Sequence, residues 1–333
     1  MKNTKILFLG ENPTTSSPTK MLAEQLERFG FESIFAYRLD FESTSKWIKS
    51  VLESDIVVLV DYDGPKSFRL RQLAIAACLF RPIVRWWVGS DVLYCIEDPA
   101  LGRAAKKLDS ISHNIVVAPH LQRELLMLNI SSMYIPSVIP IDFQEVIEES
   151  STVRDSVLVY LPSKRKEFYG YSNVKRIIER MPRVKFLVVG DVEHSLSSYE
   201  NVSSLGWVED MGQIWPSVRC ILRLTKHDGM PRIILEGLRR GCYAVYSWKM
   251  PGCSLAKSAE QAIPLLEKAF MGPKINERAQ SAFSNLMEPL PAELYSRELD
   301  RIKSSVRVRA LYWVKGLWLV LSHTIQGYIS RRD

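Results

Sequence analysis

Residues 220–247 read CILRLTKHDGMPRIILEGLRRGCYAVYS, and this stretch decides the fold. A short β-rich run opens it and a polar loop follows as far as Gly229. Pro231 then suits the first position of a helix, because a missing N–H costs nothing there. Gly241 after two arginines is a usual helix end, and a second β-rich run closes the stretch. Helical spacing predicts that one helix face packs on a sheet, through Met230, Ile233, Ile234, Gly237 and Leu238.

The junction between loop and helix carries the chemistry of this strand–loop–helix–strand unit. Gly229 lets another group approach the backbone closely, and the N–H groups at a helix start favour an anion such as a pyrophosphate. Asp228 stands just outside the helix, and Glu236 lies five residues beyond Pro231, about 7 Å further along the axis. Two carboxylates therefore bracket a predicted anion site.

Each carboxylate also has an ordinary structural interpretation. Asp228 can simply cap the helix with its side chain. Glu236 can pair with Arg232 and Arg240, its neighbours one helical turn before and after. Both interpretations stay open at the level of sequence.

The run Asp228-Gly-Met-Pro-Arg-Ile-Ile-Leu-Glu236, continued by Gly-Leu-Arg-Arg-Gly241, resembles the signature of family 4 retaining glycosyltransferases of the GT-B fold. The usual form of that signature is E-x7-E, whereas this chain has Asp-x7-Glu. The resemblance implies that Glu236 holds the nucleotide ribose and that Asp228 contacts the donor sugar. The other nucleotide-binding residues that we assign on this basis are Gly229, Met230, Pro231, Lys166 and Gly190.

The N-terminal half alternates short apolar strands with amphipathic helices. This alternation predicts a parallel sheet covered on both faces, with a ligand crevice at the carboxyl ends of its strands. The expected strands are Ile6–Leu9, Ser33–Ala36, Ile56–Val60, Ile83–Val88 and Ile115–Ala118.

Three of these strand ends carry suggestive residues. The loop Gly10–Thr19 is rich in hydroxyls, and Asp61–Gly64 is either a site or a solvated turn. Val88-Gly-Ser-Asp91 resembles the HGTD or HGSD segment of many family 4 enzymes, with Val88 where those enzymes have His. The resemblance implies that Asp91 faces the cleft as a catalytic residue. His120, at the next strand end, either supplies an imidazole to the cleft or is structural.

The second half repeats the alternation, and its first strand, Val157–Leu161, runs into a basic turn. Lys164, Arg165 and Lys166 follow this strand directly, at its carboxyl end. Cations there can clamp a diphosphate and stabilise a departing nucleotide, which the resemblance implies for an Arg and a Lys of this region. We assign Lys164 and Arg165 to catalysis, with a solvated basic turn as the alternative.

Later elements of the second half also follow the family's order. A strand at Val184–Val189 ends at Gly190, and a helix is expected to lead from Val208 to Ser217. Prolines, acids and hydroxyls over residues 137–155 mark a connector. We therefore divide the chain into an acceptor-side Rossmann-like domain (1–145), a nucleotide-sugar-binding Rossmann-like domain (146–300) and a basic, aromatic helical segment (301–333).

Bulk composition agrees with a globular protein of two domains. The 333 residues are 47% apolar and 24% charged. The five cysteines form no CxxC pair, so we expect free thiols in a reducing compartment. The opening residues do not read as a signal peptide, and we expect a cytoplasmic protein.

These features together predict an enzyme with α/β architecture of the GT-B type, two Rossmann-like doubly wound domains facing a cleft. It would transfer a sugar from a UDP- or GDP-linked donor with retention of configuration, stabilising the diphosphate leaving group. No metal or other cofactor is expected, since the sequence has no DxD-type loop in a site-like context and no His/Cys ligand spacing.

Three other functions compete with glycosyl transfer. An NAD-linked oxidoreductase would need a glycine-rich first turn, which neither Gly10 nor Gly190 opens. A nucleic-acid binder is disfavoured because no recognition motif appears and the positive charge is confined to the C-terminal segment. A degenerate GT-B scaffold that binds nucleotide-sugar or glycan stays open, because Asp228 and Val88 depart from the family pattern.

The segment 301–333 carries most of the net charge of +7, with seven cations against one acid. Its aromatic residues suit a lipid–water boundary, while its cations leave it too short of apolar residues to span a bilayer. We expect it to seat the protein on an anionic membrane face, with a lipid-linked glycan or surface polysaccharide as acceptor. The alternative is a helix that packs back across the domain junction through Leu311, Val314, Trp318 and Leu321.

Overall fold

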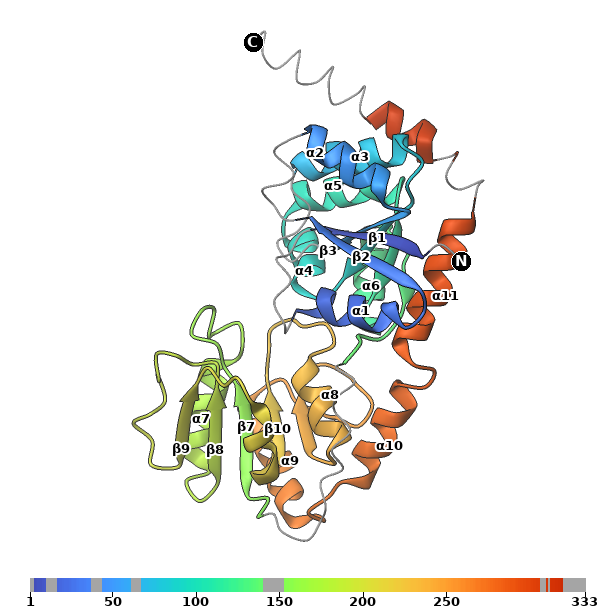
Figure 1. Ribbon diagram of the computed structural model, residues 1–333. Helices are drawn as coiled ribbons and strands as arrows, with labels where there is room; N and C mark the ends of the chain where they lie inside the picture. Colours follow the sequence, from blue (N-terminus) through green and yellow to red (C-terminus); the bar gives the residue numbers. More distant parts are fainter. Residues whose placement is uncertain are drawn as a thin grey trace, which may run out of the picture. The chain divides into compact units, whose positions relative to one another are not determined.

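The computed structural model describes residues 3–9, 17–36, 44–60, 67–139, 153–305, 310 and 312–319. The chain forms two compact units, Met1–Pro140 with Pro289–Asp333, and Ile141–Glu288 (Figure 1). Residues 289–300, which the sequence analysis placed in the nucleotide-binding domain, thus belong with the first unit. Residues 10–16 of the predicted loop Gly10–Thr19, the predicted loop at 61–64 and the predicted boundary at residue 145 lie outside the described residues. The last two residues of the first loop, Pro18 and Thr19, are helical and were not predicted so.

In the described part of the first unit, six parallel strands run in the order β2-β1-β3-β4-β5-β6. Their bounds are β1 Thr4–Leu9, β2 Phe31–Ala36, β3 Ile56–Val60, β4 Ile83–Trp87, β5 His113–Val116 and β6 Met133–Tyr134. The labelled helices of this unit are α1 Pro18–Glu27, α2 Thr44–Glu53, α3 Ser67–Cys78, α4 Ser90–Glu97, α5 Pro99–Asp109, α6 Pro119–Met127 and α11 Pro291–Ser304, and residues 312–319 are helical as well. The predicted parallel α/β alternation is confirmed.

The inner strands of this sheet form because their residues are almost uniformly apolar. Every residue of β3 and β4 is buried, as a parallel sheet covered on both faces requires. The one cation inside β4, Arg85, donates from Nη1 to the carbonyl oxygen of Ala105 at 3.1 Å. A buried charge is tolerable in this sheet only with such a polar partner.

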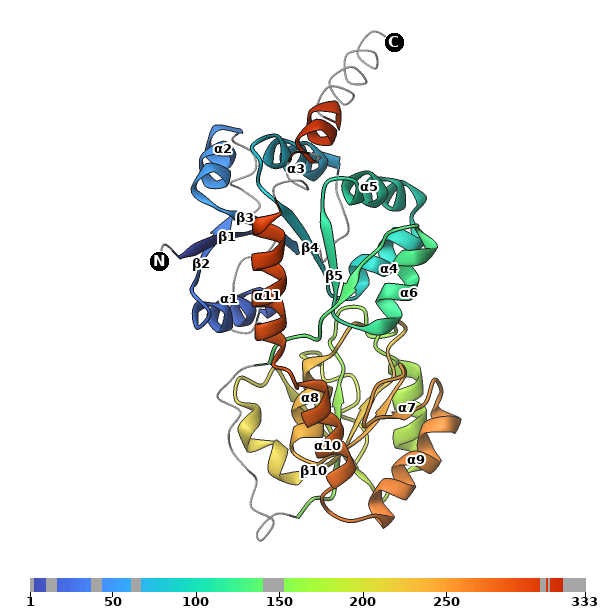
Figure 2. The same cartoon turned by 90° about the vertical axis from the view of Figure 1, so that its right-hand side faces the viewer.

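Helix α11 returns the chain to the first unit after the second unit is complete. It lies beside α1 (Figure 2), and Tyr295, Leu299 and Ile302 are its largest buried apolar residues. The Tyr295 hydroxyl donates to the carbonyl oxygen of Ile135 at 3.3 Å, and its ring meets that of Trp86 edge-on at 5.7 Å. Burial of this apolar face explains why residues 289–300 pack with the first unit.

The second unit contains, within its described residues, a parallel sheet in the order β12-β11-β10-β7-β8-β9. Its strands are β7 Ser156–Tyr160, β8 Lys185–Val189, β9 Val202–Gly206, β10 Val218–Arg223, β11 Tyr243–Tyr246 and β12 Ser254–Leu255. Its helices are α7 Tyr171–Arg180, α8 Arg232–Arg239, α9 Ala259–Met271 and α10 Glu277–Leu286. The strand order reverses between β7 and β10, so the ligand crevice of such a sheet is expected at the carboxyl ends of these two strands.

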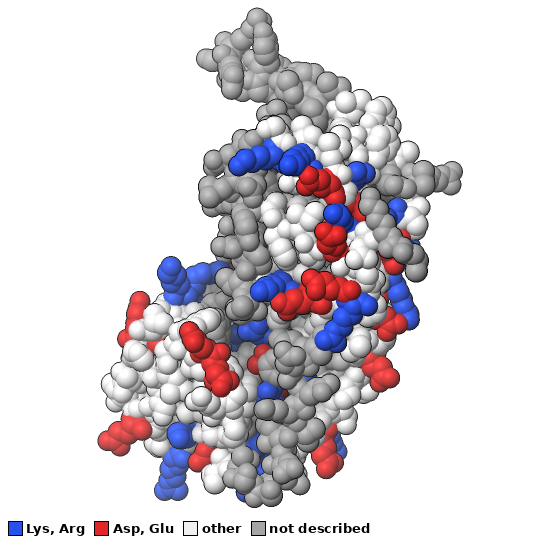
Figure 3. Space-filling model, in the orientation of Figure 1, with Lys and Arg blue, Asp and Glu red and all other residues white. Residues whose placement is uncertain are grey.

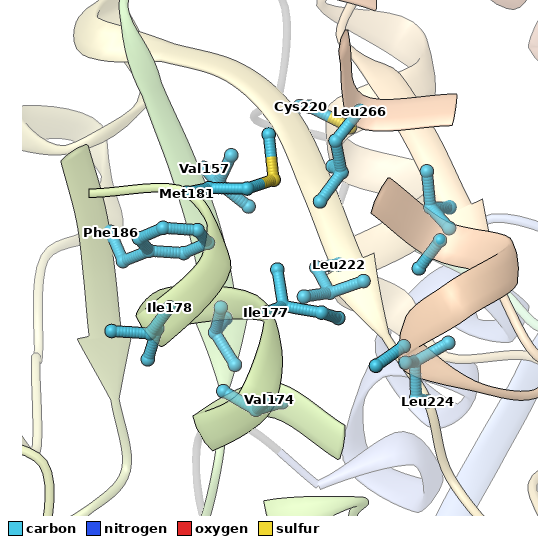
Figure 4. Packing of buried hydrophobic residues seen from close by; sticks show 14 of the residues in the cluster. Val157, Val174, Ile177, Ile178, Met181, Phe186, Cys220, Leu222, Leu224 and Leu266 are labelled. Atoms are coloured by element: carbon cyan, nitrogen blue, oxygen red, sulfur yellow. The ribbon is translucent and has the colours of Figure 1, made fainter. Parts of the chain in front are cut away.

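Apolar side chains of α7 and α9 fill the space over one face of this sheet. Ile177 of α7 and Leu266 of α9 pack with Leu222 of β10 in a single buried cluster (Figure 4). On α8, Gly237 lies so close to β10 that a Cβ atom would stand 1.9 Å from Cδ1 of Ile221. Only a residue without a side chain allows that helix to approach the sheet so closely.

One predicted helix of this unit is absent from the described structure. Between Val208 and Ser217 the chain forms two short 3-10 turns, η2 Met211–Gln213 and η3 Trp215–Ser217, so the prediction of a helix to Ser217 was wrong. Pro216 within the second turn cannot donate a backbone hydrogen bond, which explains why no α-helix continues there.

All five cysteines are free thiols, as their spacing predicts.

No helix among the described residues is both long enough and apolar enough to cross a bilayer.

Candidate functional site

Helix α8 is the element on which the predicted acidic motif lies. It begins at Arg232, with Pro231 as the extended residue before it, so Pro231 stands one position earlier than predicted. The carbonyl oxygen of Pro231 accepts from the N–H groups of Ile234 at 3.1 Å and Leu235 at 3.3 Å. The helix ends as predicted at Gly241, whose φ of +68° favours glycine.

Asp228 lies three residues before Pro231, the N-cap residue of α8, so it is not itself the capping residue. Its Oδ2 instead accepts from Nε of Arg223 at 2.5 Å and from the hydroxyl of Thr225 at 3.4 Å, while Oδ1 accepts from the N–H of Gly229 at 3.1 Å. The Asp228 side chain is 15% exposed. The carboxylate is therefore held by a side chain of the preceding strand, at the edge where β10 ends.

Arg223 is a site residue that the sequence analysis missed. It is the last residue of β10, its side chain is almost fully buried, and its guanidinium carbon lies 5.4 Å from the rings of both Tyr160 and Tyr169. Burial alone would lower the pKa of Arg223, but the charge and hydrogen bond of Asp228 raise it above its ordinary value. The sequence did contain a signal for this residue, because a cation at the carboxyl end of an apolar strand stands five residues before Asp228, the first acid of the motif.

Glu236 lies on the buried side of α8. Its side chain is 7% exposed, and Oε1 pairs with Nε of Arg232 at 3.0 Å. Arg240 donates to the backbone carbonyl oxygen of Glu236 at 3.2 Å. Burial raises the pKa of Glu236, and the charges of Arg232 and Arg240 offset part of that rise. The ordinary helical pairing with Arg232 is thus present, and it holds this carboxylate in place on the helix.

The loop after β7 is shaped by Gly190 and Asp191 at the end of the neighbouring strand β8. Gly190 has a φ of +88°, and a Cβ there would stand 3.0 Å from the Tyr160 ring. Asp191 accepts from the hydroxyl of Ser163 at 3.0 Å and from the hydroxyl of Ser195 at 2.7 Å. Burial opposes ionisation of Asp191, but these hydrogen bonds lower its pKa overall. Gly190 therefore acts within the protein as a close-packing position beside the loop.

Lys164, Arg165 and Lys166 lie in this loop. Lys164 and Arg165 are exposed, and Arg165 takes a φ of +61° with its guanidinium 4.0 Å from the ring of Phe168. Lys166 is half-buried, and its Nζ lies 4.0 Å from a carboxylate oxygen of Glu193. Two of the three cations thus reach solvent, where an anionic ligand could meet them.

The loops after β7 and β10 are joined by their backbones. The N–H of Lys226 donates to the carbonyl oxygen of Phe168 at 2.8 Å. Gly170 has a φ of +82°, and any side chain there would collide with the carbonyl oxygen of Leu224. The structure therefore brings the basic loop and the Asp228 loop together at the reversal of strand order.

Asp91 lies in the first unit and is bound by its own turn. It is 1% exposed, and its carboxylate accepts from the N–H groups of Val88 at 3.0 Å, Gly89 at 2.8 Å and Val92 at 2.9 Å. His120, at the start of α6, is buried as well. Among the described residues, no group of three or more His, Cys, Asp and Glu side chains could hold a metal ion.

No family model matches the chain, and no curated protein matches it in sequence. Solved structures are similar to it in fold. The Anabaena HepE structure, in complex with UDP and glucose, has a TM-score of 0.63 at 14% identity, covering 91% of this chain and 100% of its own. Sucrose-phosphate synthase from Thermosynechococcus elongatus has a TM-score of 0.67 at 10% identity, covering 90% of this chain and 98% of its own.

A glycosyltransferase from Rickettsia africae is similar over the same extent, with a TM-score of 0.63 at 14% identity and coverage of 91% and 98%. These matches extend over both units, each of which carries a parallel Rossmann-like sheet. The architecture predicted from the acidic motif and from the alternation of strands and helices is confirmed: the chain has the GT-B fold of glycosyltransferases.

Proposed function

We propose that the chain is a retaining glycosyltransferase that moves a sugar from a UDP- or GDP-linked donor to a hydroxyl group of an acceptor glycan. The observation that carries this proposal is the meeting of the basic loop and the Asp228 loop at the reversal of strand order in the second unit. The similar HepE protein was solved with UDP and glucose, which is the ligand chemistry that such an edge would hold.

The proposed roles divide the donor among three groups of residues. Glu236 would accept hydrogen bonds from the ribose hydroxyls, and its buried carboxylate is already oriented by Arg232. Lys164 and Arg165 would neutralise the diphosphate as the bond to the sugar breaks, because both extend into solvent from the loop. Gly229, Met230 and Pro231 would present the backbone before α8 to the phosphates, beside Lys166 and Gly190.

Asp228 would lie next to the sugar, and Arg223 would fix the position of its carboxylate. Asp91 would act by shaping the turn before α4, since three backbone N–H groups already bind its side chain. In the transfer itself, the bond from the anomeric carbon to the diphosphate oxygen breaks and a bond to the acceptor oxygen forms, while the proton of the acceptor hydroxyl passes to the departing diphosphate oxygen. This scheme stabilises the leaving group with side-chain and backbone charges and assigns no step to a metal.

A lipid-linked glycan or a growing surface polysaccharide is the acceptor class that we propose. The support is the basic and aromatic composition of residues 301–333, which suits a surface where such acceptors are held. On the face seen in Figure 3, basic and acidic side chains of the described residues are interspersed, without the broad basic surface that a nucleic-acid acceptor would need.

Thermal unfolding of the full chain with UDP, GDP, their sugar conjugates and NAD is the first test. A ligand that binds only the folded protein at 100 times its Kd adds about 2.7 kcal/mol of stability. We expect one nucleotide class to raise the midpoint, NAD to have no effect, and Glu236→Gln to reduce the shift. Glu260→Gln is the matched control, because Glu260 is an exposed glutamate of the same unit that pairs with Arg176. No shift with any nucleotide would contradict the proposal.

A binding protein on the same scaffold is the second candidate, and one observation favours it. The carboxylate of Asp228 is already engaged by Arg223, and Val88 occupies the position where the family has a histidine. The two candidates differ in turnover. A nucleotide-sugar that shifts the unfolding midpoint but is neither transferred nor hydrolysed with any glycan acceptor would identify the binding protein.

A further inference from the structure

The helical residues 312–319 of the first unit show two different faces. Tyr312, Gly316 and Leu319 are buried against the unit. The opposite face is exposed and apolar. It consists of Trp313, Val314, Leu317 and Trp318, which we call the tryptophan face, and Trp318 is 67% exposed.

Close packing fixes which face points outward. Gly316 lies against α3, where a Cβ atom would stand 2.9 Å from both the carbonyl oxygen of Ala74 and the Cβ of Ala77. The ring of Trp313 stacks on that of Phe80 at 5.9 Å with an interplanar angle of 6°. Figures 1 and 2 both show this short helix beside α3. Rotating the helix to bury Trp318 would drive a side chain into the position that only Gly316 can occupy.

The sequence analysis offered packing as the alternative role of this segment and named Val314 and Trp318 within the packing face. That assignment was wrong, because Val314 is 57% exposed and Trp318 is among the most exposed large apolar residues of the described chain. Leu311 and Leu321, also named there, lie outside the described residues. Four adjacent apolar side chains on one exposed helix face, two of them tryptophans, are the mark of a surface that meets another apolar phase.

Charge distinguishes the kinds of partner. Arg301 and Lys303 pair with acids of the same unit, at 2.5 Å from Glu298 and 3.5 Å from Asp55. Lys315, on the helix itself, has no ion pair among those that the structure describes. The sequence adds cations on both sides of the helix, Arg307, Arg309, Arg331 and Arg332, against the single acid Asp333.

We propose that the tryptophan face, with Lys315 on the same helix, docks the first unit on an anionic lipid bilayer. Indole rings prefer the boundary between headgroups and acyl chains, and cations next to them are attracted by anionic headgroups. A second copy of the chain fits this surface less well, because each copy carries a net charge of +7 and the two would repel each other. Docking of this kind requires no donor or acceptor, so it can be tested separately from glycosyl transfer.

Flotation of the full chain with vesicles tests the proposal. At low salt we expect the protein to float with vesicles of mixed phosphatidylcholine and phosphatidylglycerol and to float weakly with phosphatidylcholine alone. Trp318→Ala combined with Leu317→Ser should lower the bound fraction at least about tenfold, while Trp318→Phe should retain most of it. Lys315→Gln with Arg307→Gln and Arg309→Gln should abolish the preference for anionic vesicles, as should raised salt.

Trp207→Ala is the matched control, because Trp207 of the second unit is equally exposed, at 66%, and lies far along the chain from the tryptophan face. Its flotation should equal that of the unchanged protein. Intact protein that stays in solution with anionic vesicles at low salt overturns the proposal. A Trp318→Ala, Leu317→Ser variant that floats as well as the unchanged protein also overturns it. The same holds if the unchanged protein binds no vesicles and sediments as a dimer that this double substitution converts to a monomer. An unchanged unfolding midpoint shows that the variant is folded.

Discussion

Asp91 and Asp228 both come shortly after a buried parallel strand, Asp91 in the first turn of α4 and Asp228 ahead of α8, yet the two units hold them in different ways. The carboxylate of Asp91 is bound by three backbone N–H groups of its own turn, all within three residues. The carboxylate of Asp228 is bound mainly by the side chain of Arg223, which the strand and two tyrosine rings hold in place. The first arrangement uses backbone N–H groups, and the second combines the N–H of Gly229 with the side chains of Arg223 and Thr225.

The difference teaches which acid can take part in chemistry. Asp91 is 1% exposed, so its bonds to its own turn fix the shape of the loop and leave little of the carboxylate within reach of a ligand. A carboxylate paired with a side chain at the open edge of a sheet keeps a negative charge next to a cation, where a donor could approach.

Removing the cation of the Arg223–Asp228 pair should have the largest effect. Arg223→Met keeps an unbranched apolar stem but removes the guanidinium, which leaves a largely buried carboxylate without its charged partner, and we expect a loss of about 3 kcal/mol or more in the free energy of unfolding. Urea denaturation measures it. Arg176→Met, which removes an exposed partner of Glu260, should cost less than about 1 kcal/mol. Equal costs for the two variants would show that burial of the pair contributes nothing.

Changing the acid itself should separate transfer from nucleotide binding. Asp228→Ala should lower the rate of sugar transfer at least about tenfold while leaving the affinity for free UDP or GDP nearly unchanged, because the contact strengthens in the transition state. Asp228→Glu, the residue that the family usually has, should retain part of the activity. Titration calorimetry with the nucleotide and a transfer assay measure the two quantities. If Asp228→Ala lowers the affinity for free nucleotide as much as it lowers the transfer rate, Asp228 has only a structural role in the loop.

The corresponding change in the first unit should affect stability rather than the donor. Asp91→Asn keeps the volume but replaces one acceptor oxygen by a donor facing backbone N–H groups, and we expect a cost of about 1–2 kcal/mol. Thermal and urea unfolding measure it, with the nucleotide-induced shift of the midpoint as the second readout. A variant of unchanged stability that has lost transfer would place Asp91 among the catalytic residues and remove the contrast with Asp228.

The smallest effect should come from the titration of Glu236. Burial raises its pKa above the ordinary value of 4.5, so the folded protein binds this proton more tightly than the unfolded chain. The contribution of this group to stability is therefore greatest below that ordinary value and falls as the pH rises through the raised pKa. Between about pH 4 and about pH 7, the free energy of unfolding of the unchanged protein should therefore fall relative to that of Glu236→Gln. A difference that stays flat would contradict the direction of the shift.

Local patterns in the sequence determined the elements and the end of the motif helix. Uninterrupted apolar runs predicted the buried strands β3 and β4, because a doubly covered parallel sheet offers no polar face. Gly241 predicted the helix end through its positive φ. The eight-residue spacing of Asp228 and Glu236 placed one acid before α8 and one on it, since these relations depend only on neighbours along the chain.

Tertiary structure alone decided the partners. Arg223 meets Asp228 because the chain turns back after β10, and the rings beside it come from β7 and from the loop that follows β7. The basic loop meets the Asp228 loop because the strand order places β7 next to β10, although about sixty residues separate them in sequence. The helix at 312–319 has apolar residues on both faces, so its periodicity could not select the buried one. Contact with α3 selected it, because Gly316 alone allows the backbones to approach.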